Sequence, residues 1–416
     1  MTDVAVIGAG VAGLSAAAAL RSAGLDVALL EARGRIGGRA WTEHPALLGG
    51  APFDHGASWL HVADRNPLAD LARQHGEALI DSDAHRQRRV FVGNRPATEA
   101  ETNAFDRCWA GVEQLAPPAA DTSLAHLLDG LADDPWLPTV ETWEGAIIEA
   151  ADATELGAQD WHSNQLDGSN LRLPGGVGDF VARRLQTDAT LDCPVNAIST
   201  SGPGVVLDTA RGTLHARACV VTVSTGVLGA LRVALPAPVQ DALHGLPMGL
   251  LSKVALRAAN GERLGLPANT SVMRRVEGRG APAMTVFAWP DNHDHVVGFM
   301  GGRAAWDRLA PADAEAFARD LLAEMFGTAG RRFAPSAVCT RWGDDPFALG
   351  SYAYARPGYA GARRTMADAC LDGCLWFAGE AYRTDGLAGT VAGAWLSGQD
   401  AAAKVKSALR APSAGP

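Results

Sequence analysis

The first stretch of the chain that could do chemistry is a glycine pattern followed closely by an acidic residue. Gly8, Gly10 and Gly13 belong to the hexapeptide GAGVAG. Glu31 stands directly after the apolar run Val27–Leu30. In a strand–turn–helix–strand unit, such glycines allow a tight turn, a close approach of the backbone to a pyrophosphate, and close packing of helix on strand. The acidic side chain can accept hydrogen bonds from a ribose. The pattern predicts a dinucleotide site and leaves open whether NAD or FAD binds there.

The elements that position these residues can be predicted from local patterns. Val4–Ile7 is a short apolar run typical of a buried parallel strand. Leu14–Ser22 is rich in alanine and predicts a helix that ends near Gly24. Val27–Leu30 predicts a second strand, so the N-terminus of the helix faces the phosphates of the nucleotide. A glycine-rich turn in an ordinary α/β unit is the alternative, and the position of Glu31 argues against it.

The composition is that of a folded protein with room for two domains. Of the 416 residues, 47% are hydrophobic and 20% are charged. The net charge of −10 argues against a nucleic-acid partner and is compatible with a cationic substrate. No run approaches the roughly eighteen apolar residues of a membrane span, so we expect no membrane partner. Because a strand is predicted from Asp3 onward, we also expect no signal peptide.

The six cysteines are predicted to be buried free thiols. Cys370 and Cys374 are close in sequence, but no histidine or second cysteine pair completes a metal-binding set. The other four cysteines are scattered along the chain. Free thiols fit a reducing compartment, so we expect a cytoplasmic location and no bound metal.

Patterns farther along predict domains assembled from separated pieces. Residues 103–155 have helical character and many tryptophans, and a set of short β runs follows them. After Leu246, four more β runs suggest a second, antiparallel sheet, and a helix begins near Pro311. The last segment returns to strand, glycine-rich turn and long helix, before a C-terminal tail expected to be disordered. We predict an α/β fold with two domains. The nucleotide-binding domain is formed by residues 1–78, 170–245 and 368–416. The substrate-binding domain is formed by residues 79–169 and 246–367.

A second stretch extends the glycine pattern and narrows the choice of cofactor. In EARGRIGGRAWT, Arg33, Gly38 and Arg39 follow Glu31 closely, and an NAD dehydrogenase has no need of them. The stretch resembles the E-A-R-x-R-x-G-G-R pattern of the flavin-containing amine oxidases. Ser224 is a departure, because the family usually has proline there. Later stretches resemble further motifs of the family, in the family's order: DHGASWLH (54–61), VTVSTGVLGA (221–230), LSKVALRA (251–258), TRWGDDPFALGSYAYARPG (340–358) and FAGEAYRTDGLAGTVAGAWLSG (377–398).

The resemblance implies a two-domain FAD-dependent amine oxidase fold, in which a Rossmann-type FAD-binding domain joins a substrate domain of mixed sheet and helix. It implies that Glu31 binds the adenosine ribose, Glu380 the ribityl chain and the backbone of Val195 the adenine. The other positions implied for FAD lie along the pyrophosphate and the isoalloxazine: Gly8, Gly10, Gly13, Arg33, Gly38, Arg39, Gly56, Ala57, Ser58, Thr390 and Val391.

Two positions bear on how the flavin is held. Val391 is implied to begin a helix whose dipole stabilises the anionic reduced flavin. Ser351 stands where monoamine oxidases carry a cysteine linked to the cofactor, so FAD is expected to be noncovalent.

The resemblance also implies an active site. Lys253 is implied to hold a water at flavin N5, although the surrounding LLSKVAL would also suit a snorkelling strand-edge lysine. Tyr352 matches one wall of an aromatic sandwich around the amine, and Thr390 occupies the other wall, as in histone lysine demethylases. His61 matches a tunnel histidine of animal polyamine oxidases, with a surface histidine as the alternative. The resemblance places Trp342 near the flavin. A tryptophan that only packs in the hydrophobic core would give the same sequence pattern.

Some nearby residues stay unassigned at this point. Tyr354 alternates with Tyr352 along a strand, so we expect only one of them to face the pocket. Four acidic residues lie in the helical segment that could cap a substrate tunnel, and none is named as a ligand: Glu141, Glu144, Glu149 and Glu155.

These observations predict a FAD-dependent amine oxidase similar to the polyamine oxidase and lysine demethylase branch. A neutral primary or secondary amine, with polyamine-type amines favoured, would give a hydride to flavin N5; the imine would hydrolyse and O2 would become H2O2. One alternative is an L-amino-acid oxidase of the same fold, with Arg274, Arg275 or Arg356 as the carboxylate ligand. A non-catalytic FAD-containing amine-binding protein is another, and an NAD dehydrogenase is the third. The oligomeric state and the particular amine stay open.

Overall fold

The predicted strand–turn–helix–strand unit is present at the start of the chain. In the computed structural model, which describes residues 2–85, 87–200, 202 and 204–410, β1 spans Thr2–Ile7, α1 spans Val11–Arg21 and β2 spans Val27–Leu30. β1 and β2 pair in parallel. The helix begins earlier than expected because Gly10, in an extended conformation, is its N-cap. The first backbone N–H groups of α1 therefore lie within the glycine pattern, directly after Gly10.

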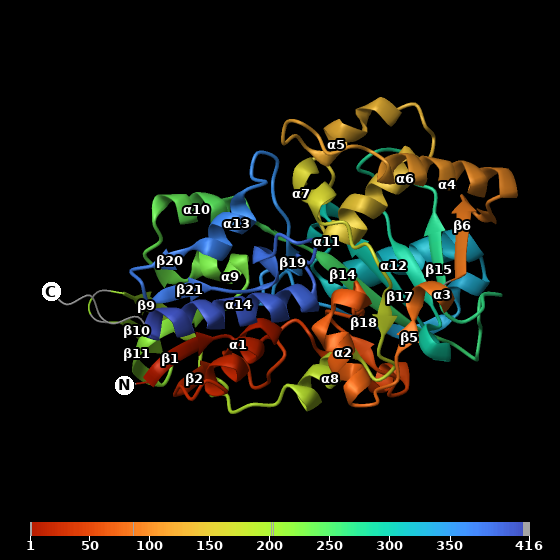
Figure 1. The fold of residues 1–416 in the computed structure, drawn as a ribbon. Helices are drawn as coiled ribbons and strands as arrows, with labels where there is room; N and C mark the ends of the chain where they lie inside the picture. Colours follow the sequence, from red (N-terminus) through yellow and green to blue (C-terminus); the bar gives the residue numbers. More distant parts are fainter. Residues whose placement is uncertain (1, 86, 201, 203, 411–416) are drawn as a thin grey trace.

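An eight-stranded sheet forms the part of the molecule around this unit, on the left of Figure 1. β11 pairs in parallel with β1 on one side and β21 on the other, so segments from the start, middle and end of the chain lie side by side. Its remaining strands are β9 (Val195–Ser199), β10 (Val205–Thr209), β11 (Gly212–Val221), β12 (Arg232–Val233), β20 (Cys370–Leu371) and β21 (Leu375–Phe377).

A seven-stranded sheet forms the other part, on the right of Figure 1. As expected, β14, β17, β16 and β15 pair antiparallel in that order. The pairing of β6 with β15 is parallel and was not predicted, because it joins segments nearly two hundred residues apart. The strands are β6 (Gln87–Val92), β7 (Arg95–Pro96), β14 (Leu251–Ala258), β15 (Thr270–Arg274), β16 (Thr285–Ala288), β17 (His295–Gly301) and β18 (Phe333–Cys339).

Short helices cover the second sheet at the top of Figure 1 and enclose a tryptophan-rich core. Trp136 and Trp161 are almost fully buried there. One element is a π-helix, η4 (Trp143–Glu149), which we call the π segment. The helices of this layer are α4 (Glu99–Glu113), α5 (Leu124–Leu127), α6 (Leu137–Thr142) and α7 (Ala158–Ser163).

The remaining elements join these layers. α12 (Pro311–Phe326) begins with Pro311, as predicted, and packs on the seven-stranded sheet. Two-stranded pairs link distant segments: β3 (Thr42–Glu43) with β4 (Phe53–Asp54), β5 (Ile80–Asp81) with β8 (Leu171–Arg172), and β13 (Met248–Gly249) with β19 (Tyr352–Ala353). The other α-helices are α2 (Pro67–Gln74), α3 (Ser82–His85), α8 (Val177–Arg184), α9 (Thr225–Ala230), α10 (Ala237–His244), α11 (Arg303–Trp306), α13 (Ala362–Asp368) and α14 (Val391–Arg410).

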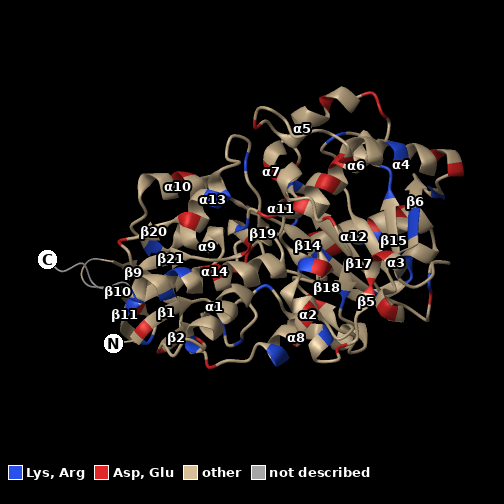
Figure 2. Cartoon of the chain, in the orientation of Figure 1, with Lys and Arg blue, Asp and Glu red and all other residues tan. Residues whose placement is uncertain are grey.

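The structure can be compared with three expectations from the composition, which concern the charges, the cysteines and the hydropathy of the helices. Acidic and basic residues alternate over both parts in the view of Figure 2. All six cysteines are free, and four of them are buried as predicted. The prediction of burial is wrong for Cys370, which is exposed, and for Cys339, which is partly exposed. Over the part of the chain that is described, no helix is long and apolar enough to cross a membrane. The cytoplasmic location and the domain boundaries stay predictions, and the expected disordered tail falls on residues 411–416, outside the described residues.

Candidate active site

One large cavity, of about 1310 Å³, extends between the two parts of the molecule. Every residue that the family resemblance assigned to FAD or to the active site lines it, with the exception of Gly13. Its nucleotide end is lined by the glycine turn, Glu31 and Val195; its helical end is lined by the π segment and by Trp109 and Glu113 of α4. The structure therefore brings together residues from both ends of the chain and from most motifs between them.

The glycine turn forms an open cradle at the nucleotide end. A Cβ on Gly13 would lie 1.9 Å from the carbonyl oxygen of Gly8, so this glycine lets α1 pack against the turn from behind. A Cβ on Gly10 would meet only the Cα of Gly38, at 4.0 Å. Gly10 thus leaves free the space that a pyrophosphate needs beside the N-terminus of α1.

Glu31 braces the same turn. Its carboxylate accepts hydrogen bonds from the backbone N–H of Ala9 (2.7 Å) and of Arg33 (2.9 Å), and it is buried. Each carboxylate oxygen can accept more than one hydrogen bond, so a ribose hydroxyl can still bind there. The side chain of Arg33 pairs with Asp345 (2.6 Å) and lies over the ring of Phe347. Arg33 therefore ties a distant loop to the nucleotide end.

Glu380 offers an unused oxygen to the cavity. Its Oε1 accepts from Arg39 (2.8 Å) and from the backbone N–H of Ala353 (3.2 Å). Its Oε2 is buried and has no hydrogen-bond partner among the described residues. An orphaned buried acceptor costs about 1–3 kcal/mol. A hydroxyl of a bound ribityl chain would satisfy it, so this site fits FAD.

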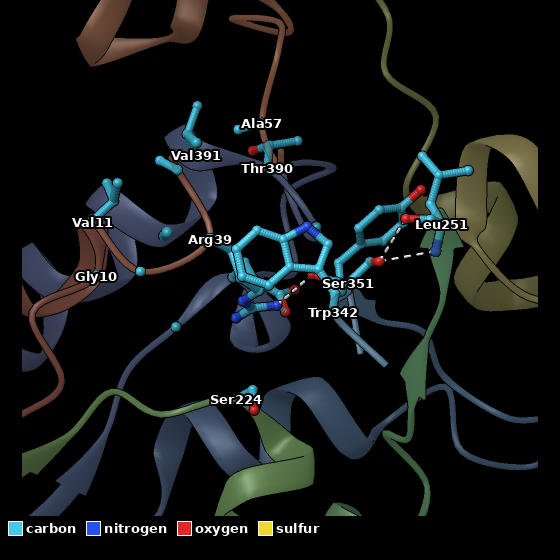
Figure 3. A pocket seen from close by; sticks show the side chains of 18 of the residues that line it. Gly10, Val11, Arg39, Ala57, Ser224, Leu251, Trp342, Ser351, Thr390 and Val391 are labelled. Atoms are coloured by element: carbon cyan, nitrogen blue, oxygen red, sulfur yellow. Dashed lines mark hydrogen bonds and ion pairs between the residues drawn. The ribbon is translucent and has the colours of Figure 1, made fainter. Parts of the chain in front are cut away.

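The N-terminus of α14 points into the cavity (Figure 3). The hydroxyl of Thr390 donates to the carbonyl of Leu387 (2.8 Å) and accepts from the N–H of Gly393 (2.9 Å), which makes it the helix cap. Val391 then opens the helix and lines the cavity. The positive end of the helix dipole faces the space where the resemblance places the flavin carbonyl.

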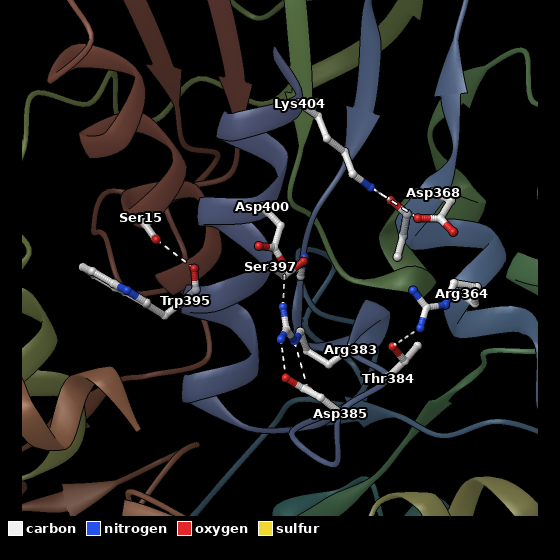
Figure 4. Close-up of polar contacts among 12 residues, drawn as sticks. Ser15, Arg364, Asp368, Arg383, Thr384, Asp385, Trp395, Ser397, Asp400 and Lys404 are labelled. Carbon is white, nitrogen blue, oxygen red and sulfur yellow. Dashed lines mark hydrogen bonds and ion pairs between the residues drawn. The ribbon is translucent and has the colours of Figure 1, made fainter. Parts of the chain in front are cut away.

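Polar contacts along α14 hold this helix in place (Figure 4). The hydroxyl of Ser15 on α1 donates to the carbonyl of Trp395 (2.8 Å). Arg383 pairs with Asp385 and with Asp400, the latter at 2.5 Å. The direction of the helix N-terminus is thus set by contacts from both sides.

The hydroxyl groups of Ser351 and Ser224 both form hydrogen bonds within the protein. The hydroxyl of Ser351 accepts from the N–H of Leu251 (2.9 Å) and donates to its carbonyl (3.0 Å), while Arg39 donates to the Ser351 carbonyl (Figure 3). Ser224 caps α9 and donates to the carbonyl of Ala348 (2.6 Å). This explains how a serine serves where the family usually has proline.

Lys253 is buried on β14 and donates to three acceptors. Its ammonium group contacts the carbonyl oxygens of Asp54 (2.8 Å) and Gly56 (2.5 Å) and the hydroxyl of Ser58 (2.7 Å). An ammonium has three N–H donors, so each has an acceptor in the segment from Asp54 to Ser58. Burial lowers the pKa of Lys253 to about 8, against the attraction of Asp54. The lysine anchors this segment, and the water at flavin N5 stays a prediction.

The aromatic residues divide as expected. Tyr352 lines the cavity, and its hydroxyl donates to the carbonyl of Ile148 (2.8 Å). Tyr354 points to the opposite side and donates to Glu155 (3.0 Å). Trp342 lines the cavity and donates through its ring N–H to the carbonyl of His55 (2.8 Å).

His61 lies on the same wall as Trp59. Its ring is stacked on that of Trp59, with centroids 6.2 Å apart, and its Nδ1 contacts the side-chain oxygen of Asn170 (2.7 Å). It lines the cavity, and its role in a substrate tunnel stays a prediction.

The helical end supplies residues that sequence reasoning left unassigned. Glu144 and Glu149 of the π segment are buried and line the cavity, together with Trp109 and Trp143. The density of tryptophan and glutamate in residues 103–155 was the available signal. No local pattern showed which of these side chains face inward, because a π-helix shifts the faces of the segment away from ordinary helical spacing.

Comparison with known proteins identifies the class. Residues 11–406 match the model of the flavin containing amine oxidoreductase family, and the chain belongs to this family. It is therefore an oxidoreductase with FAD as its cofactor and with an FAD-dependent amine oxidase fold.

Two relatives align with almost the whole of this chain. Polyamine oxidase 4 of Oryza sativa subsp. japonica is 30% identical over 454 residues, which cover 96% of this chain and 88% of that protein. Lysine-specific histone demethylase 1 homolog 1 of Arabidopsis thaliana is 30% identical over 446 residues, 97% of this chain but about half (52%) of the relative.

Solved structures share the fold at lower identity. Cyclohexylamine oxidase from Brevibacterium oxydans has a TM-score of 0.79 at 23% identity, and putrescine oxidase bound to putrescine has 0.78 at 22%. Each comparison covers 98% of this chain and 99% of the other.

Proposed function

We propose that this protein oxidises the C–N bond of a primary or secondary amine, with polyamine-type amines favoured, and that O2 is the final acceptor. When bound, FAD supplies the acceptor for the hydride from the carbon next to nitrogen, and its reoxidation by O2 gives H2O2. One amine, one O2 and one water then yield one carbonyl compound, one amine or ammonia, and one H2O2. The single cavity that joins the glycine turn to Lys253 and Tyr352 carries this proposal.

The residues of the chain contribute position and environment. The ring of Tyr352 forms a wall against which the amine carbon can be held, and orientation of this kind lowers the barrier to transfer. Lys253 holds the segment from Asp54 to Ser58 against the cavity. The imine that leaves the site is hydrolysed by water.

The charge of the helical end supports a cationic substrate. Four residues with carboxylate side chains line this part of the cavity: Asp83, Glu113, Glu144 and Glu149. Arg88 lines it as well, but its guanidinium pairs with Asp106 and lies over the ring of Phe105. A predominantly negative wall favours a protonated amine over an anion.

The L-amino-acid alternative needs a basic residue for the substrate carboxylate. Arg274 pairs with Glu324, Arg275 lies over the ring of Trp136, and Arg356 contacts His244. None of these three arginines is among the described residues that line the cavity. The geometry thus supports an amine without a carboxylate.

A peroxide-coupled screen of polyamines, alkyl monoamines and amino acids tests the proposal. We expect H2O2 from di- and polyamines first, weaker turnover of monoamines, and none of amino acids. Catalase and protein stripped of FAD are the controls. Turnover confined to L-amino acids would support the alternative, and reduction by amines that needs an artificial acceptor instead of O2 would show a dehydrogenase.

A further inference from the structure

The π segment is a tightly fitted element of the cavity wall. A Cβ on Gly301 of β17 would lie 1.6 Å from the carbonyl oxygen of Ala146, and one on Gly249 of β13 would lie 2.7 Å from that of Ala150. Only glycine at these two strand positions allows the segment to approach so closely. π-Helices are rare and occur often at functional sites. The segment is therefore held in a fixed position from which its side chains enter the cavity.

Glu144 is a buried carboxylate on this segment with little to neutralise it. Its side chain lines the cavity, and the residue is only 7% exposed. The ring N–H of Trp161 donates to its Oε2 (3.2 Å). Across the described residues, no lysine, arginine or histidine forms an ion pair with it. Burial raises the pKa of Glu144 to about 7, and repulsion from Glu113 adds to the effect.

Two other buried carboxylates of the same layer have cationic partners, and the positive charge of Arg363 acts on a third, Glu149, which also lines the cavity. Asp160 forms two hydrogen bonds with Arg363, both of 2.7 Å. Glu141 pairs with Arg279 (2.5 Å). A buried charge without such a partner is costly, so its presence in a cavity wall points to a cationic ligand. Neither of the two paired carboxylates is among the described residues that line the cavity.

Aromatic rings at the same end of the cavity suit the same ligand. Trp109 of α4 and Trp143 of the π segment line the cavity, and their rings lie 5.4 Å apart at 58°. An ammonium group gains about 0.5–2 kcal/mol over the face of a tryptophan ring. A carboxylate and indole rings that line the same end of one cavity therefore suit a protonated amine.

We propose that Glu144 binds a second, protonated amino group of a diamine or polyamine whose other nitrogen is the one oxidised. This inference rests on the proposed function and names the residue that makes the site selective. A diamine of the right length neutralises the buried carboxylate, whereas a monoamine leaves it unpaired. Selectivity for a second cation then arises from a partner that only the diamine supplies.

The test compares unbranched α,ω-diamines of increasing length with alkyl monoamines of matched length. In the parent enzyme we expect the best diamine to exceed its monoamine at least tenfold in kcat/KM. In Glu144→Gln, which keeps the shape and the acceptor for Trp161, this preference should fall at least tenfold, mainly through KM for the diamine. Turnover of monoamines should change less than threefold. Glu99→Gln is the matched control, because this glutamate is exposed on α4 of the same layer and is not among the described residues that line the cavity, and we expect less than a threefold effect.

A binding measurement separates recognition from turnover. A diamine with two methyl groups on each carbon next to nitrogen has no hydride to lose, so its affinity can be measured by calorimetry in air. We expect Glu144→Gln to weaken it at least tenfold and to leave the matching monoamine unaffected. A parent enzyme that oxidises amines without preference for diamines would overturn this inference alone. A parent enzyme that oxidises no amine would overturn the proposed function instead.

Discussion

The two ends of the cavity are built in different ways. At the nucleotide end, the polar groups are largely satisfied by neighbouring backbone: Glu31 accepts from Ala9 and Arg33, and Gly10 leaves an open space beside α1. At the helical end, Glu144 has a single donor from the protein and no ion-pair partner among the described residues. The first end is prepared for one cofactor, and the second leaves a charge for the substrate to neutralise. The affinity for FAD and the selectivity among amines should therefore respond to different substitutions.

The largest effect is expected from filling the nucleotide cradle. In Gly10→Val, the new side chain would occupy the space bounded by Gly38, so FAD affinity should fall at least hundredfold, about 2.7 kcal/mol. The apoprotein should still fold, because Gly10 already has an extended backbone conformation that valine can adopt. Titration of apoprotein with FAD measures this. Gly111→Ala, in open space on α4, is the control, and a parent-like affinity in Gly10→Val would place the pyrophosphate elsewhere.

A somewhat smaller loss is expected from Glu31→Ala. The substitution removes an acceptor from the ribose and from the N–H groups of Ala9 and Arg33, worth about 1.5–3 kcal/mol. FAD retention should weaken by roughly one to two orders of magnitude. If the variant holds FAD as tightly as the parent protein in the same titration, the glycine pattern has been misassigned.

Lys253→Met should separate chemistry from cofactor binding. The methionine keeps most of the apolar stem but leaves the acceptors of Asp54, Gly56 and Ser58 without their donor. The variant should stay yellow and lose at least tenfold in turnover, about 1.4 kcal/mol. Anaerobic mixing with amine, followed by O2, shows which half-reaction slows. Parent-like rates in both would mean that Lys253 only anchors the segment from Asp54 to Ser58 and takes no part in the chemistry.

Tyr352→Phe tests the link between the π segment and the amine. The ring remains, but the hydrogen bond to the carbonyl of Ile148 is lost. We expect KM for the best amine to rise several-fold with little change in kcat, and amide exchange in the π segment to quicken. Tyr354→Phe is the matched control, because its ring points away from the cavity. Equal effects of the two substitutions would argue against a role for the π segment in binding.

The smallest expected effect is a pH-dependent difference in stability. Burial raises the pKa of Glu144 from 4.5 to about 7, so the folded protein favours the neutral carboxyl. Ionisation therefore costs stability progressively as pH rises from the lower value to the higher one, and Glu144→Gln escapes this cost. Its melting temperature should match the parent near pH 4 to 5 and exceed it by a few degrees, for about 1–3 kcal/mol, at about pH 8. Thermal unfolding of both proteins measures this, and a constant difference across pH would contradict it.

Much of the nucleotide end could be predicted because its information is local. The turn, the strand before it and the acidic residue after the second strand lie within about thirty residues, and each follows from backbone geometry or burial. The second sheet was predicted in its antiparallel core, where each strand carries its own pattern. Its parallel edge with β6 was not, since pairing between distant segments leaves no local mark.

By itself, the sequence determined the βαβ turn, the order of the family's motifs, and hence FAD and the amine oxidase fold. Only the tertiary structure decided which side chains meet. It placed Asp345 on Arg33, gave Lys253 three acceptors, and left Glu144 buried without an ion-pair partner among the described residues. The reason is physical: desolvation and charge pairing depend on what surrounds a group in space, and for these residues the surroundings come from segments far apart in the chain.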